Sequence, residues 1–360
     1  AGYILIGNIA GGFDQTFLSN PSLSWEKTYM ANIGIDFGLA RGRLNGSVDI
    51  YDKRTKGILI SLPAPLEHGT STVPNQNAGE VDNRGFEIDL SWNDRVGNVG
   101  YHVGFNMAFV SNKVTRFRGD VPSIDGVYRT LEGHPINQLY VMKVDRIVRD
   151  DSDLEYVKSL VDRNPDYFAT YQRPELGDLL FADTNMDGKL DADDRVTIGH
   201  GDMPRITYGI SLGATWKGFD FSAMFQGTGD RKVYYNNQAF RFVTVMGQSL
   251  NKDITDNAWT PDNPYDSKYP ILRNSSNSKN NIASDAFVHN AAYLRCKNIQ
   301  LGYTLPAGIT RKFYVENVKI YASIDNLFTI TDFPGFDPEI GASVGYPPVR
   351  QYSIGINVSF

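Results

Sequence analysis

The sequence predicts an all-β chain that forms part of an antiparallel transmembrane β-barrel. Apolar and polar residues alternate over long stretches, with the period of two that places successive side chains on opposite faces of a strand. Aromatic residues make up 12% of the 360 residues, and 34 glycines accompany them. Short and long connections alternate between these stretches, which is typical of barrels that cross an outer membrane.

About ten strands are expected, several of which keep the alternation for about 10–15 residues. A strand of a soluble sandwich has about 5–6 residues, whereas a strand that crosses a bilayer needs about 9–11. The polar face carries mainly Gly, Ser, Asn and Asp, which suits a water-filled lumen. The expected strands lie near residues 2–9 (the weakest) and at 25–39, 44–53, 86–92, 99–109, 206–216, 219–225, 293–305, 318–328 and 351–360.

The connections between these strands favour a barrel over a sandwich. Tight turns are expected at 40–42, 94–98 and 217–218, with a modest connection at 306–317. Long loops fall strictly between them, so that one rim has short turns and the other has long loops. A lipid-facing sheet must also close, because unpaired backbone groups are costly in hydrocarbon. The long loops are expected at 10–23, 56–83, 112–204, 228–292 and 329–350.

Composition excludes several other classes. The net charge of −6 comes from mixed acidic and basic residues, so the sequence shows no cluster of basic residues of the kind that binds nucleic acid. No run of about 18 apolar residues is present, which excludes a transmembrane helix. Cys296 is the single cysteine, and both Cys296 and His102 are expected to face the lumen. The segment GISLG (209–213) resembles a nucleophile elbow, but it lies within a strand rather than a strand–turn–helix, so we predict no enzyme.

The last strand, QYSIGINVSF (351–360), alternates up to the final residue. It is expected to pair inside a closed ring, with its end at the short-turn rim and an aromatic residue in the interfacial girdle. The apolar positions of this predicted barrel-assembly strand are Tyr352, Ile354, Ile356, Val358 and Phe360.

Three stretches resemble the SusC-like TonB-dependent transporters of Bacteroidetes outer membranes. They are NPSLSWEKTYMANIGIDFGLARGRLNGSVDIYDKRTKGIL, GDLLFADTNMDGKLDADDRVTIG, and YLRCKNIQLGYTLP followed by VKIYASIDNLFTITDFPGFDPE. The terminal aromatic residue also resembles the assembly signal of this family. The resemblance runs through nearly the whole chain in consistent order.

The resemblance implies a barrel of about 22 strands, of which residues 1–360 would be the C-terminal part. The expected partners are outer-membrane lipid, the remainder of the same barrel, a SusD-like surface lipoprotein, and TonB acting through an N-terminal region. The chain shows neither a plug sequence nor a TonB box, so it is expected to be part of a longer protein. The implied function is import of oligosaccharides or peptides. A calcium-stabilised surface adhesin or glycan-binding module is the alternative.

The segment DTNMDGKLDADD (183–194) predicts a calcium loop within the long 112–204 connection. Calcium prefers six to eight hard oxygen ligands, which alternate residues around a tight turn supply, with glycine at the sixth position and an apolar anchor at the eighth. The predicted role of Ca²⁺ is structural, because an ion would order loop backbone. The ligand positions are Asp183, Asn185, Asp187, Lys189 (through its carbonyl), Asp191 and Asp194.

Two further features lie in the long connections. Residues 151–163 are expected to form a short helix that starts with a capping box at Ser152 and Glu155. The 228–292 loop is rich in aromatic, amide and hydroxyl side chains, which suit sugars or peptide backbones. Its candidate ligand or partner contacts are Tyr234, Tyr235, Asn236, Arg241, Trp259 and Tyr265.

Overall fold

The computed structural model describes residues 2–5, 8–11, 20–60, 75–117, 122–237, 240–243, 249–274, 279–343 and 345–360. Nine long strands form one antiparallel sheet, and each strand pairs with its neighbour in the chain. Their order across the sheet is β3 (Lys27–Leu39), β4 (Leu44–Ile60), β5 (Gln76–Val96), β6 (Val99–Phe117), β13 (Ile206–Trp216), β14 (Phe219–Gly229), β17 (Tyr293–Thr304), β18 (Asn317–Thr331) and β19 (Gln351–Ser359).

One face of this sheet is apolar and open. The strand register aligns apolar residues into rows, such as the row formed by Ile33, Ile50, Phe86, Phe109 and Ile206. Ile33 is 77% exposed and Ile50 is 63% exposed, so no second sheet covers this face in the described part of the chain. The alternation therefore belongs to a single barrel wall, as predicted, rather than to a sandwich.

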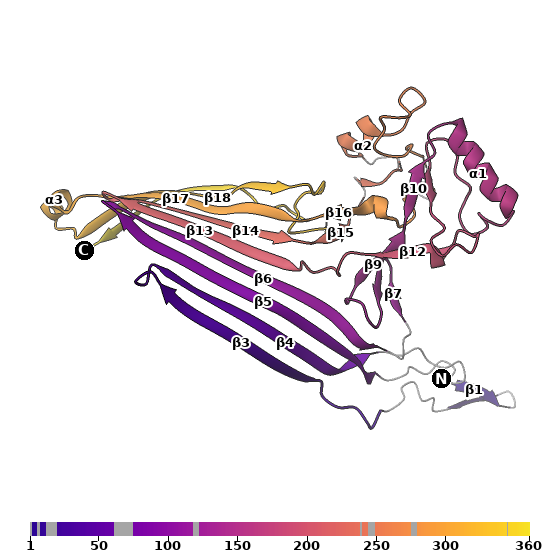
Figure 1. Ribbon diagram of the computed structural model, residues 1–360, viewed down its shortest axis with the longest axis horizontal. Helices are drawn as coiled ribbons and strands as arrows, with labels where there is room; N and C mark the ends of the chain where they lie inside the picture. Colours follow the sequence, from indigo (N-terminus) through magenta and orange to yellow (C-terminus); the bar gives the residue numbers. More distant parts are fainter. Residues whose placement is uncertain are drawn as a thin grey trace.

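The height of the apolar face matches a bilayer. The eleven residues of β13 extend about 35 Å, and a strand tilt of about 40° reduces this to about 27 Å along the barrel axis. The apolar band of an outer-membrane barrel is about 25 Å tall. Figure 1 shows the strands converging on the short-turn end, near α3 (Ala307–Thr310) and the C-terminus, with the long connections at the opposite end.

The opposite face of the sheet carries polar side chains. His102 lies on this face, where its Nδ1 is 2.8 Å from Asn93 Oδ1, as predicted. Cys296 does not, and the prediction that it faces the lumen is wrong. The register shifts between Cys296 and Asn298, and this bulge inserts one residue and reverses the alternation. Cys296 is consequently paired with Phe225 and Phe328 on the apolar side.

The strands are longer than predicted at the long-loop end, where β5 begins at Gln76 and β6 ends at Phe117. At the N-terminus, a single strand near residues 2–9 was expected. The structure instead has β1 (Gly2–Leu5) and β2 (Asn8–Gly11), which pair with each other in a separate sheet. The principal sheet thus contains nine of the roughly ten strands expected.

The long connections fold into a compact layer beyond the strand ends. No helix in the described ranges has both the length and the apolar character that a membrane span requires. The layer has its own apolar core, which includes Leu179, Leu190, Ile254 and Phe287. Its elements are β7 (Ser123–Asp125), β8 (Tyr128–Thr130), β9 (Gln138–Met142), β10 (Val144–Ile147), α1 (Asp151–Arg163), β11 (Leu179–Phe181), η2 (Ala192–Asp194), β12 (Arg195–Ile198), β15 (Lys232–Tyr234), α2 (Lys252–Asn257), η4 (Lys279–Asn281), η5 (Asp285–Phe287) and β16 (Val288–Asn290). A further short helix, η6 (Arg311–Phe313), follows α3 at the short-turn end.

The helix predicted at 151–163 is confirmed as α1, but its cap differs from the prediction. Asp150, not Ser152, is the N-cap residue, and its Oδ1 accepts from the backbone nitrogens of Ser152 (3.0 Å) and Asp153 (3.2 Å). These hydrogen bonds satisfy two of the free N–H groups of the first turn.

Tyrosine rings cover glycines on neighbouring strands of the sheet, and this leaves no room for a side chain. A Cβ built on Gly227 would lie 2.3 Å from the ring of Tyr208 and 2.5 Å from the carbonyl oxygen of Tyr293. We expect Gly227→Val to destabilise the intact barrel by about 1–3 kcal/mol, as overpacking does. Thermal unfolding in detergent measures the change. Gly308→Ala is the control, because no atom lies within 4 Å of its built Cβ, and equal losses in both variants would contradict the prediction.

Candidate functional site

A buried ion pair network joins the two longest connections into one body. Asp178 in the first connection is fully buried. Its carboxylate accepts from Arg273 Nε at 3.0 Å and Nη2 at 2.9 Å, and Lys279 Nζ lies 2.8 Å away. Asn280 Nδ2 donates to the same carboxylate at 3.0 Å. Since a buried carboxylate without partners is strongly unfavourable, this network fixes the position of one loop on the other.

Several of the predicted contact residues lie in the core of this loop layer. Tyr235 is 1% exposed and packs between the rings of Phe240 and Phe333, at centroid distances of 4.8 and 5.1 Å. Trp259 is 5% exposed, and its Nε1 donates to the carbonyl of Arg149. In this structure both side chains stabilise the layer, and contact with a ligand stays a prediction.

The other predicted contact residues are more accessible. Tyr265 is 67% exposed, and its hydroxyl donates to Asp150 Oδ2 at 2.8 Å. Tyr234 receives a hydrogen bond from Asn236 Nδ2 at 3.1 Å, and burial raises its pKa. Asn236 Oδ1 and Arg241 Nε are buried and have no hydrogen-bond partner within the described residues. Unpaired buried polar atoms are unusual, and contact of these two residues with a ligand stays a prediction.

The predicted calcium loop folds as a tight turn that is anchored on the loop core. Gly188, at the sixth position, has φ +79°, a conformation that favours glycine. Leu190, the predicted apolar anchor at the eighth position, is 2% exposed. Asn164 Nδ2, just after α1, donates to the carbonyl of Gly188 at 2.7 Å. The loop therefore closes against the end of α1.

Two carboxylates of this loop, those of Asp183 and Asp194, are turned toward its interior. Asp194 is fully buried, and its oxygens accept from the backbone nitrogens of Thr184, Asn185 and Asp191. Asp183 Oδ2 accepts from Gly188 N at 2.9 Å, whereas its buried Oδ1 has no partner in the described part of the chain. Desolvation raises the pKa of Asp194. Burial, with the charge of Asp183 nearby, raises the pKa of Tyr167 to about 12.

The remaining predicted ligands are arranged around the same turn. Asn185 Oδ1 accepts from Asp187 N, Asp187 Oδ1 accepts from Lys189 N, and Asp191 Oδ1 accepts from Asp193 N. Across the described residues, no three His, Cys, Asp or Glu side chains converge closely enough to form a complete metal site on their own. Calcium also accepts backbone carbonyl oxygens, Asn oxygens and water as ligands. This turn offers carboxylate, Asn side-chain and backbone carbonyl oxygens.

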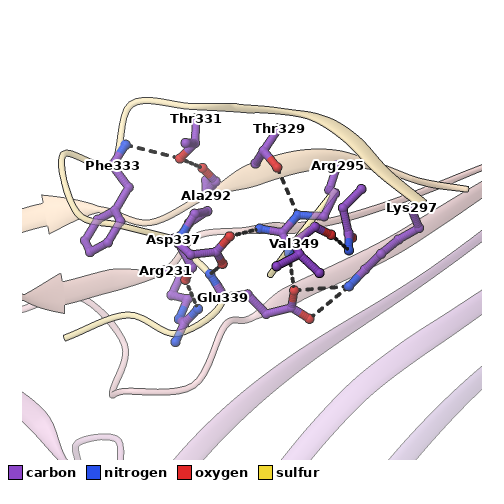
Figure 2. Close-up of polar contacts among 12 residues, drawn as sticks. Arg231, Ala292, Arg295, Lys297, Thr329, Thr331, Phe333, Asp337, Glu339 and Val349 are labelled. Carbon is purple, nitrogen blue, oxygen red and sulfur yellow. Dashed lines mark hydrogen bonds and ion pairs between the residues drawn. The ribbon is translucent and has the colours of Figure 1, made fainter. Parts of the chain in front are cut away.

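A second ion-pair cluster lies on the polar face of β17 (Figure 2). Arg295 is 1% exposed, and its guanidinium donates to Asp337, to Glu339 Oε2 at 2.6 Å, and to Thr329 Oγ1 at 2.9 Å. Lys297 Nζ lies 3.1 Å from Glu339 Oε2. Arg295 thereby holds the β18–β19 connection against the inner side of the wall.

Sequence reasoning missed both of these networks. Asp178 and Arg273 are 95 residues apart, and Arg295 and Asp337 are 42 residues apart. No local pattern marks such pairs, because each charged residue alone is indistinguishable from a solvated loop residue. The segment PGFDPE (334–339), which contains Asp337 and Glu339, belongs to a stretch that resembles the family, and this resemblance is the available signal for the second network.

The serine at the centre of GISLG does not form a catalytic site. Ser211 lies in the middle of β13, and His102 Nε2 is 3.2 Å from its Oγ. The other ring nitrogen of His102 contacts the amide Asn93 rather than a carboxylate, and no helix follows Ser211 as a nucleophile elbow requires. The geometry agrees with the prediction that GISLG lies within a strand and is not a nucleophile elbow.

Comparison with known proteins identifies the family. Residues 2–327 match the family model described as TonB dependent receptor-like, beta-barrel. The chain is 29% identical to TonB-dependent receptor P39 of Formosa agariphila over 98% of its own length and 37% of that protein. It is 26% identical to TonB-dependent receptor SusC of Bacteroides thetaiotaomicron, over 95% of this chain and 32% of that protein. The chain thus spans about a third of the length of these relatives.

Solved structures agree with this result. The structure of the RagAB peptide transporter superposes with a TM-score of 0.75 at 26% identity, covering 99% of this chain and 38% of the other. The RagAB peptide importer in its open-open state gives a TM-score of 0.76 at 27% identity, covering 96% and 36%. The chain therefore belongs to the TonB-dependent receptor β-barrel family of the Gram-negative outer membrane, which is non-enzymatic, and it resembles the SusC and RagA receptors within that family.

Proposed function

We propose that this chain forms part of the barrel wall of an outer-membrane importer that takes up oligosaccharides or peptides. The single observation that carries the proposal is that the two faces of the sheet differ in polarity. One face carries apolar rows whose combined height matches a bilayer, and the other carries polar residues. Resemblance to the RagAB peptide importer and to SusC supports it. Membership in a barrel family also argues against the alternative of a soluble adhesin or glycan-binding module.

The open edges of the sheet support the presence of further strands. Within the described residues, β3 and β19 each pair on one side only. Exposed strand edges are unfavourable in hydrocarbon, so the remainder of the same barrel would pair with both. The exposed residues Tyr352, Ile354 and Ile356 on β19 fit the proposed assembly strand. Energy would come from TonB acting through a plug in the rest of the protein.

The loop layer is the proposed docking surface for a SusD-like surface lipoprotein. It is held rigidly by the Asp178 network and carries exposed Tyr265 on its surface. Rigid aromatic side chains are common anchors in protein interfaces. Asn236 and Arg241, whose side chains are partly exposed, are further residues that we assign to contact with a ligand or the lipoprotein.

We also propose a structural Ca²⁺ ion at residues 183–194. The free, buried Oδ1 of Asp183 and the desolvated carboxylate of Asp194 support this assignment, because a cation would neutralise charge that the protein leaves uncompensated. The ligands would be those predicted, with Lys189 contributing only its carbonyl. The ion would supply no reaction chemistry, and it would hold the turn against Asn164 and Tyr167.

Uptake by cells tests the transport proposal. The full-length protein is deleted and then restored in its native host, and growth is measured on oligopeptides, on oligosaccharides and on the corresponding monomers. We expect growth on one oligomer class to be lost on deletion and regained on restoration, while growth on monomers is unchanged. A surface lipoprotein should co-purify with the detergent-extracted receptor. Normal growth on every oligomer, or extraction of the protein without detergent, would contradict the proposal.

A further inference from the structure

The outer face of β3–β6 changes character just above the apolar rows. Beyond the row of Ile33, Ile50, Phe86 and Phe109, the strands continue toward the long-loop end. Three further outward-facing rows consist mainly of charged residues, listed here by row: Ala31, Asp52, Arg84 and Ser111; Tyr29, Arg54, Asp82 and Lys113; and Lys27, Lys56, Glu80 and Arg116. We call these three rows the cationic band.

The cationic band is positively charged in a chain whose net charge is −6. It contains six basic and three acidic side chains, which gives a formal charge of +3. Its ion pairs are partly exposed: the side chains of Arg54, Arg84 and Arg116 are 50%, 61% and 68% exposed. No ion pair with Lys27 or Lys113 is present among the described residues. The acidic groups therefore orient the basic ones without neutralising the band.

The height of the cationic band places it at the headgroups of the membrane. Successive rows are about 7 Å apart along a strand, or about 5 Å along the barrel axis at the usual tilt. The apolar rows of β13 end at Ile206, opposite Phe109, so the band begins one row above the hydrocarbon. The headgroup region on each side of a bilayer is about 5–8 Å thick. The first row of the band falls within this layer, and the second row, about 10 Å above the last apolar row, lies just outside it.

A groove in the cationic band provides a binding surface. It has a volume of about 460 Å³, lies along the β3 edge of the sheet, and is lined by Tyr29, Met30, Ala31, Asp52, Arg54 and Lys56. An aromatic ring, aliphatic stems and two cations in one groove suit a phosphorylated sugar above acyl chains. Arg84 and Arg116 lie on β5 and β6, well inside the sheet edge, so a further strand paired with β3 would leave them facing the membrane.

We propose that the cationic band binds the phosphate groups of outer-leaflet lipid and so fixes the height of this wall in the membrane. Guanidinium groups recognise phosphate by paired, charge-assisted hydrogen bonds. Basic clusters at the membrane surface bind anionic headgroups for the same reason. The proposal rests on the proposed function, in which a surface lipoprotein docks on the loop layer, so that the long loops lie outside the cell.

Binding of a defined lipid by the full-length receptor in neutral detergent tests this proposal. The probes are lipid A carrying one phosphate and the same lipid after removal of that phosphate, and native mass spectrometry measures the bound fraction. We expect the wild type to prefer the phosphorylated lipid by about tenfold or more, since several basic side chains act together. The preference should fall with rising salt, because the pairs are exposed. Excess inorganic phosphate should not displace the lipid, whose acyl chains add to its binding.

The variant R54Q/K56Q/R84Q/R116Q should lose most of this preference. Its matched control, R41Q/R95Q/K217Q/K312Q, removes the same charge from exposed positions near the short-turn end and should keep it. Heat-modifiable migration in electrophoresis shows whether each variant has folded. If a variant does not fold, the salt dependence of the lipid preference of the wild type tests the cationic band instead. A wild type without preference, an unchanged quadruple variant, or displacement by inorganic phosphate would overturn the proposal. If the preference for phosphorylated lipid is absent but the protein is still extracted only by detergent, the transport proposal is unaffected.

Discussion

Replacement of Arg295 by methionine is expected to destabilise the intact barrel by about 3–5 kcal/mol, the usual cost of removing one partner from a buried ion pair. The guanidinium is 1% exposed and contacts both Asp337 and Glu339. Asp337 is itself 8% exposed, so without Arg295 its charge remains in a poorly solvated place. Methionine is similar in length, which limits the loss of packing. The β18–β19 connection should then detach from the polar face of β17.

Thermal unfolding of the full-length receptor in detergent measures the loss of stability. Limited proteolysis of the β18–β19 connection shows where it occurs. Lys297→Met is the matched control, because Lys297 contacts the same Glu339 but its side chain is 26% exposed, and exposed pairs contribute about 0–1 kcal/mol. The double variant R295M/D337N should recover part of the stability, since the unpaired charge is gone. Equal losses for R295M and K297M would contradict the assigned role.

The wall of the barrel was predictable from the sequence wherever its two faces differ in polarity. β13 and β14 were predicted with few errors because Ile206, Ile210 and Trp216 alternate with small or polar residues throughout their length. The short connections followed from the points at which alternation stops. The apolar positions 25–39 also lie on the open face, as a membrane wall requires.

The sequence was uninformative where the outer face becomes polar. Above Ile50 and Phe86 the outward residues are Asp52, Arg54 and Arg84, so the outer face is hydrophilic and the alternation of outward apolar and inward polar residues disappears although the strand continues. The expected loops at 56–83 and 112–204 were therefore too long. The bulge at Cys296–Asn298 had no signal either, because one inserted residue reverses every later position.

The loop layer shows the complementary case. The predicted turn at 183–194 was found because its residues are adjacent in sequence and its spacing is set by local geometry, with Gly188 at φ +79°. Burial of Tyr235 and Trp259 was not predicted, because it depends on how distant segments pack. Composition alone does not distinguish an aromatic residue that contacts a ligand from one that fills a core.

Asp194→Asn is expected to abolish calcium stabilisation of the loop layer. If the ion binds as proposed, calcium at about ten times its dissociation constant stabilises the wild type by about 1.4 kcal/mol, which slows cleavage through local opening about tenfold. The variant loses this effect, and it also weakens charge-assisted hydrogen bonds worth about 1.5–3 kcal/mol each, since Asp194 accepts from Thr184 and Asp191. Proteolysis of the full-length receptor between α1 and β12, with calcium and with a chelator, measures both effects.

The pH dependence of this proteolysis separates a bound ion from simple packing. Burial raises the pKa of Asp194, so the folded loop favours the protonated carboxyl when no ion is bound. Without calcium, the stability of the loop should thus decrease as the pH rises through this raised pKa, whereas bound calcium opposes the decrease. The calcium effect should accordingly grow with pH. Asp193→Asn is the matched control, because Asp193 is exposed and occupies no predicted ligand position. The proposed calcium site would be contradicted if a chelator had no effect on the wild type, or if the two variants behaved identically.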